Sequence, residues 1–102
     1  MEDFFQGDII RIGDYKQNFL IISKNAFIRS TGMFHVCPFL DHVSEGPLHI
    51  AAKGVSGTNG TAITEQLKLI DPRARRVKKT DRLAYRDIME VSDAVQGIFE
   101  YD

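Results

Sequence analysis

The chain has 102 residues, of which 43% are hydrophobic, 26% charged and 10% aromatic, and this composition fits one globular domain over residues 1–102. Seven Phe and many aliphatic residues exclude a disordered chain, and no apolar run approaches the roughly 18 residues that a membrane-spanning helix needs. Thirteen basic and fourteen acidic residues give a formal net charge of −1. This balance excludes a molecule that is basic as a whole, although it still permits a local basic patch.

The single cysteine, Cys37, excludes an intrachain disulfide and a zinc site built from four thiolates. Residues 1–3 are acidic at the point where a secretory signal is basic, so we expect a cytoplasmic protein. A metal site would require a strand ladder that joins His35 to His49. Half-buried strand histidines are the simpler interpretation, and we expect neither a metal nor a cofactor.

Short apolar runs separated by turn signals predict strands over most of the first 70 residues. The run Phe19–Ile22 has no polar interruption, which predicts a strand buried on both faces. Glycines and an Asn-Gly pair in residues 54–60 predict a turn or hairpin tip. The other predicted strands are Ile9–Ile12, Phe34–Cys37 ended by Pro38, an edge strand at Leu48–Ile50, a stretch over 61–70, and a short strand within 73–79.

The C-terminal region has a helical period, because its apolar residues recur at alternating intervals of four and three. These residues are Ala84, Ile88, Val91, Val95 and Ile98. Thr80 or Asp81 is the expected cap of this helix. Strands followed by one helix predict an α+β fold, namely a small antiparallel sheet or open barrel with a helix packed on it.

Two segments carry the residue types needed for chemistry on a nucleic acid. The run Arg73–Lys79 contains five cations among seven residues, enough for several phosphate contacts, although such runs are often solvated surface. The segment Asp41–Glu45 combines carboxylates with the imidazole of His42, which suits acid–base chemistry and is also common in surface loops. Cys37 is best interpreted as a small buried hydrophobic residue.

In order along the chain, several elements resemble the MazF/PemK (Kid) family of toxin endoribonucleases, whose barrel is similar to that of the CcdB gyrase poisons. The opening Gly7-Asp8-Ile9-Ile10, the strand Phe19–Ser23 and Thr31-Gly32-Met33 all resemble family elements. Gly60 with Glu65-Gln66 resembles a Gly-x-x-x-x-Asp-Gln element, and residues 71–79 resemble the basic stretch that follows it. The resemblance covers nearly the whole chain and implies a CcdB-like or SH3-like barrel with a C-terminal helix.

The resemblance also implies a function and partners. Members of this family are homodimeric toxins that cut single-stranded RNA without a metal, and a cognate antitoxin inhibits them by covering the RNA-binding surface. Such chemistry needs a cation at the phosphate and a proton acceptor near the 2′-oxygen. By this resemblance Arg73, Arg75 and Lys78 are expected to hold RNA, and Glu65 and Gln66 to brace the sheet beside the site.

The sequence departs from the family at its main catalytic positions. Gln17 and Asn18 stand where the family has Arg-Pro, and Phe39–Asp41 stand where it has Thr or Ser. Ile63 occupies a further position that is Arg in some relatives. The catalytic candidates are therefore Lys16 as the cation, Gln17 as a hydrogen-bond donor, and Asp41 or His42 as the base.

Two alternatives to an active ribonuclease remain. The chain could retain the fold and act on another target through its C-terminal helix end (Ile98, Phe99 and Tyr101), as the gyrase-directed relatives do. It could also be an inactive remnant that only binds an antitoxin. Phe99 has a simpler structural interpretation as the last core contact of the helix.

Overall fold

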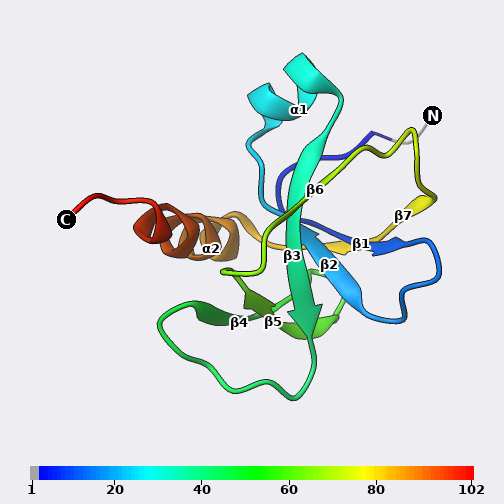
Figure 1. Ribbon diagram of the computed structural model, residues 1–102. Coiled ribbons are helices and arrows are strands. Elements are labelled where there is room, and N and C mark those ends of the chain that lie inside the picture. Colours follow the sequence, from blue (N-terminus) through cyan, green and yellow to red (C-terminus); the bar gives the residue numbers. More distant parts are fainter. Residues whose placement is uncertain (1–2) are drawn as a thin grey trace.

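Seven antiparallel strands and two helices make up the part of the chain that the computed structural model describes, residues 3–102 (Figure 1). The strands are β1 (Asp8–Ile12), β2 (Asn18–Ile21), β3 (Phe34–Leu40), β4 (His49–Lys53), β5 (Asn59–Ile63), β6 (Lys68–Ile70) and β7 (Val77–Arg82). The helices are α1 (Asn25–Thr31) and α2 (Tyr85–Ile98). Neither helix has the length and apolarity that a membrane crossing requires.

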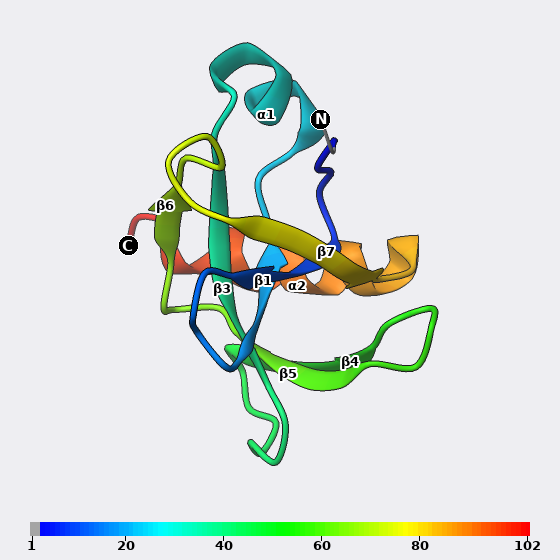
Figure 2. The same ribbon diagram turned by 90° about the vertical axis from the view of Figure 1, so that its right-hand side faces the viewer.

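The central strand β3 organises the sheet, whose order is β4-β5-β3-β2-β1-β7. Along one edge β3 pairs with β2, and along the other it pairs first with β6 and then with β5. This division curves the sheet into an open barrel, and α2 packs across one side of it (Figures 1 and 2). The predicted α+β barrel with a C-terminal helix is confirmed, and so is the edge position of the predicted strand at Leu48–Ile50.

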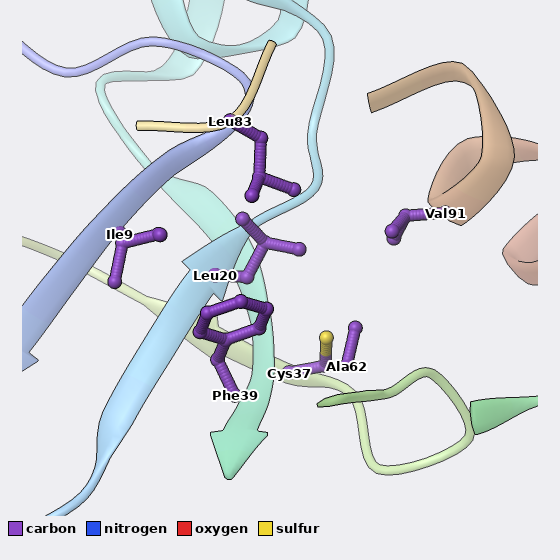
Figure 3. Close-up of a cluster of buried hydrophobic side chains, with 7 residues drawn as sticks. All are labelled: Ile9, Leu20, Cys37, Phe39, Ala62, Leu83 and Val91. Atoms are coloured by element: carbon purple, nitrogen blue, oxygen red, sulfur yellow. The ribbon is translucent and has the colours of Figure 1, made fainter. Parts of the chain in front are cut away.

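Strand β2 is buried on both faces, as its uninterrupted apolar run predicts. Leu20 lies in a core beneath α2, together with Leu83 and Val91 (Figure 3). Phe19 and Ile21 lie in a second core on the opposite face of the sheet. All three β2 side chains are at most 4% exposed, because successive strand residues point to opposite faces and both faces are covered.

Pro38 does not end its strand, contrary to the prediction, since β3 continues to Leu40. The Ile22 N–H donates to the His35 carbonyl, so every second backbone group of β3 faces β2 and the Pro38 nitrogen points to the other edge. There the pairing with β6 stops at Val36 and the pairing with β5 starts at Phe39. The missing N–H of Pro38 therefore falls in a gap of the ladder, where no donor is required.

Other boundaries also differ from the sequence-based expectations. The stretch 61–70 holds the end of β5, a turn and β6, and the predicted strand within 73–79 contributes only the first part of β7. Helix α1 was not predicted, because seven residues with no fully buried side chain leave no periodic signal. It ends at Gly32, whose φ of 72° suits glycine and whose N–H donates to the Ile28 carbonyl.

The predicted helix α2 exists, but two expectations about its ends are wrong. Ala84 occupies the N-cap position, and neither Thr80 nor Asp81 caps the helix, because both belong to β7. Phe99 is 71% exposed rather than a final core contact. The C-terminal end of α2 projects beyond the sheet, so its last turn has little to pack against (Figure 1).

Asp81 fastens the β4–β5 hairpin to β7. Its buried carboxylate accepts hydrogen bonds from the backbone N–H groups of Ser56, Thr58 and Arg82 at 2.8–3.1 Å. Gly54 allows this approach, since a Cβ at that position would overlap the Asp81 carboxylate. Burial raises the pKa of Asp81, but these hydrogen bonds outweigh it and lower the pKa to about 2.

We expect Asp81→Ala to lower the free energy of unfolding by about 2 kcal/mol at neutral pH, because buried N–H donors lose their acceptor. The folded-state pKa lies below the unfolded value of 3.8, so the stabilisation is complete above about pH 4 and is lost as the pH falls towards 2. Urea unfolding of wild type and variant across this range measures both effects. Asp93→Ala, at an exposed position of α2, is the control. If the Asp81 variant and wild type had equal stability and equal sensitivity to acid, the Asp81 carboxylate would not stabilise the fold as we infer.

Candidate active site

The connection between β1 and β2 is held in place by contacts at both of its ends. Arg11 donates to the Tyr15 carbonyl at 3.3 Å, and Asp14 pairs with Arg76 at 3.1 Å. The Tyr15 ring meets the Phe19 ring edge-on, with centroids 5.5 Å apart and an interplanar angle of 81°. The connection lies on the far side of the molecule from the C-terminal end of α2 (Figure 1). These contacts fix the position of Tyr15 relative to the sheet.

Two cations converge on the Tyr15 side chain from distant parts of the sequence. The Lys68 ammonium of β6 lies 5.3 Å from the centre of the Tyr15 ring, within the range of a cation–π interaction. The positive charge of Lys68, followed by polar contacts from Arg75 and Lys68, lowers the pKa of the Tyr15 phenol. The Tyr15 residue is 42% exposed, so this cluster is open to a ligand.

Tyr15 lines two hollows of the surface. We call the first, of about 190 Å³, the Tyr15 groove; its walls are Tyr15, Gln17, Phe19, Val36, Pro38, Gln66, Leu67 and Lys68. A second hollow of about 510 Å³ is lined by Ile12, Gly13, Asp14, Tyr15, Arg75 and Arg76. Aromatic rings, amides and cations that line one concave surface suit a single-stranded nucleic acid, because rings stack on bases and cations hold phosphates.

Arg75 also connects to a third hollow, which is larger and more apolar. This hollow has a volume of about 630 Å³, and we call it the apolar hollow. Its walls include Phe4, Phe5, Ile28, Phe34 and Val77, with Arg29, Arg73 and Arg75 among its lining residues. The second hollow therefore shares Arg75 with the apolar hollow and Tyr15 with the Tyr15 groove.

The predicted catalytic residues lie at one end of the β2–β3 pair. Gln17 lines the Tyr15 groove, and Lys16 is an exposed residue between Gln17 and Tyr15. Asn18 pairs with Phe39, so the β2–β3 register brings Asp41 to the same end of the sheet as Lys16. His42 follows in a turn with a φ of 61°, and both Asp41 and His42 are exposed. None of the three hollows is lined by Lys16, Asp41 or His42.

The predicted RNA-binding cations are divided between different surroundings. Arg75 lines two hollows, whereas Arg73 lines only the apolar hollow and is held by Asp71 at 2.8 Å. Lys78 alternates with Val77 along β7 and so points to the opposite face of the strand. Of these three cations, Arg75 is the one that interacts with the Tyr15 side chain.

The remaining histidines and the cysteine have structural surroundings. His35 pairs with Leu69 of β6 and contacts the Ser23 hydroxyl at 2.8 Å, whereas His49 contacts Glu65 at 3.0 Å. The ladder therefore does not join His35 to His49, and residues 3–102 contain no cluster of metal-ligating side chains. Burial raises the pKa of the Cys37 thiol to about 12, which keeps it protonated and unreactive at neutral pH.

Sequence reasoning missed Tyr15 and Lys68. Tyr15 directly precedes the candidate Lys16 in a short polar connection, so an aromatic residue at that point was an available signal. Lys68 gave no such signal in the sequence, because a single lysine next to apolar residues in a short strand is typical of a solvent-exposed position.

The fold matches that of solved toxin structures. The chain is similar to the MazE–MazF complex (Form-II) from Deinococcus radiodurans, with a TM-score of 0.83, 16% identity and coverage of 100% of both chains. It is also similar to MazF (Form-I) from the same organism, with a TM-score of 0.79 and 16% identity over 96% of this chain and 97% of that one. An endoribonuclease from a mycobacterial species gives a TM-score of 0.78 and 17% identity over 95% and 91%. No curated protein sequence gives a significant match.

These likenesses define the fold as that of the MazF toxins. A family model described as PemK-like, MazF-like toxin of type II toxin-antitoxin system matches residues 7–99. The chain therefore belongs to the PemK/MazF toxin family, as the resemblance of its sequence elements indicated.

Replacing Lys68 by Met is expected to raise the pKa of Tyr15, because the positive charge with the largest effect on the phenol is removed while most of the aliphatic side chain is kept. The phenol carbon resonance of Tyr15, followed by NMR during a pH titration, measures the change. Lys53→Met, on the exposed end of the edge strand β4, is the control and should leave the Tyr15 titration as in wild type. An unchanged pKa in the Lys68 variant would show that the two side chains do not interact in solution.

Proposed function

We propose that this family member is a toxin that cleaves single-stranded RNA as a metal-independent endoribonuclease. The observation that carries the proposal is the convergence of two cations on Tyr15: Lys68, which lines the Tyr15 groove, and Arg75, which lines the second hollow. This arrangement supplies positive charge and a stacking surface at a position where the family Arg is replaced by Gln17. Independence from metal is an expectation from the resemblance to the family.

The reaction requires charge stabilisation at one phosphate. The 2′-oxygen attacks phosphorus, and the pentacoordinate transition state gains negative charge on its non-bridging oxygens. In our proposal Lys68 and Arg75 hold these oxygens, and Gln17 donates a hydrogen bond from the wall of the groove. A bound base stacks on the Tyr15 ring, because ring faces bind bases of any sequence.

The residues around this groove supply the further roles. Lys16, an exposed cation next to Gln17 in the chain, neutralises the scissile phosphate. Asp41 or His42 takes the proton of the 2′-hydroxyl, since the β2–β3 register places this turn near the start of β2. Arg73 binds a phosphate further along the RNA. Lys78 points to the opposite face of β7, so it would contact only RNA that continues around this strand.

We also propose that the chain forms a homodimer and that a cognate antitoxin inhibits it. The solved MazE–MazF complex has a similar fold in its toxin, which motivates the antitoxin assignment. The apolar hollow suits a peptide segment with apolar and acidic residues, because its phenylalanines are accompanied by Arg29, Arg73 and Arg75. Such a segment would reach Arg75 and so compete with RNA.

Purified protein should cleave a long, partly unstructured RNA in the presence of EDTA. Arg75→Ala and Lys16→Ala should each slow cleavage by at least about tenfold, because each removes a cation from the reacting phosphate. Gel analysis of the products under single-turnover conditions measures the rate. Lys53→Ala, which removes a cation far from the groove, is the matched control.

The alternative functions give different results in the same assay. Intact RNA together with growth arrest on expression would favour an interaction toxin that uses the exposed C-terminal end of α2, where Phe99 is 71% and Tyr101 98% exposed. Intact RNA without growth arrest, with antitoxin binding retained, would favour a protein that only binds its antitoxin.

A further inference from the structure

Cleavage of an RNA backbone needs a proton donor as well as a base. When the 2′-oxygen bonds to phosphorus, the bond from phosphorus to the 5′-oxygen breaks and its electron pair passes to that oxygen. An alkoxide is a poor leaving group, so a proton delivered during this step accelerates the reaction. The residues assigned in the proposed function act as cations, as a hydrogen-bond donor and as a base, but none of them is assigned to give a proton to the 5′-oxygen.

We propose that Tyr15 is this general acid: its hydroxyl gives its proton to the departing 5′-oxygen, while the cations of Lys68 and Arg75 stabilise the phenolate that remains. The inference rests on the proposed ribonuclease function and deepens it. The products are a 2′,3′-cyclic phosphate and a 5′-hydroxyl. Asp41 or His42 then releases to solvent water the proton that it took from the 2′-hydroxyl, and solvent water returns a proton to Tyr15, so that atoms and charges balance over the cycle.

The geometry supports this role in three ways. Tyr15 lines both the Tyr15 groove and the second hollow, so an RNA strand that fills both would contact this residue. The ring is oriented by its edge-on contact with Phe19, and the backbone is held by the bond from Arg11 to the Tyr15 carbonyl. The 42% exposure of the residue leaves room for a substrate to reach it.

The charged surroundings favour an acid over a base. Lys68 of β6 and Arg75 of the β6–β7 connection face the side chain, and Arg11 of β1 lies at its carbonyl. The neighbouring carboxylate, Asp14, is paired with Arg76. Lys68 and Arg75 make the phenol a stronger proton donor than a free tyrosine, because they stabilise its ionised form.

The test compares Tyr15→Phe with wild type on two substrates. The variant keeps the ring, its stacking surface and the contact with Phe19, and loses only the hydroxyl. On ordinary RNA we expect it to cleave about 100-fold more slowly than wild type. On RNA with sulfur in place of the 5′-oxygen at a site mapped with the wild-type protein, we expect nearly wild-type rates, because a thiolate leaves without a proton.

Tyr85→Phe, at a 75% exposed position on the opposite side of the sheet, is the matched control and should cleave both substrates at the wild-type rate. The pH profile adds an independent measurement: the wild-type rate should fall at high pH as the Tyr15 phenol ionises, and the variant should lack this decrease. Equal slowing of the variant on both substrates, or no slowing on either, would overturn the acid role. If wild type binds RNA but cleaves neither substrate, the proposed ribonuclease function fails, and the acid role fails with it.

Discussion

The burial of β2 and β3 on both faces is the constraint on which the rest of the structure depends. Leu20 and Cys37 contribute to the core beneath α2, whereas Phe19 and Val36 contribute to the opposite core. A shift of either strand by one residue would move Phe19 and Val36 into the space that Leu20 and Cys37 fill, and the reverse. Because these side chains differ in size and shape and both cores are closely packed, such a shift is unfavourable. The position of every loop that carries a site residue follows from this register.

The change of partner along β3 creates the surface where the site lies. Because β6 pairs only with the first part of β3, Lys68 lies at the end of the β6 pairing, opposite Val36 and close to the gap at Pro38. The Tyr15 groove opens at this interruption. Its lining includes Val36 and Pro38 of β3, and Gln66 and Leu67 of the turn between β5 and β6. A continuous ladder would have filled this space with another strand. Pro38 has no N–H to donate, and it stands in the gap between the β6 and β5 pairings, where the groove opens.

The loss of the family Arg changes how positive charge reaches the site. Gln17 keeps a hydrogen-bond donor at that point of the chain but carries no charge. The cations that act on Tyr15 come from later parts of the chain: Lys68 from β6, and Arg75 from the connection between β6 and β7. In the proposed mechanism, an aromatic hydroxyl beside two cations would provide binding, charge stabilisation and proton transfer from a small number of side chains. The divergence of the sequence therefore need not remove the chemistry.

The sequence by itself determined the elements whose signal is local. The apolar run of β2, the edge strand β4 and the helical period of α2 all follow from the spacing of neighbouring residues, and the ordered motifs identified the family. The burial of Asp81, the passage of β3 through Pro38 and the cluster of Tyr15, Lys68 and Arg75 could not be read in this way. These features join segments that are far apart in the chain, and only strand pairing and the closing of the sheet decide which of those segments meet.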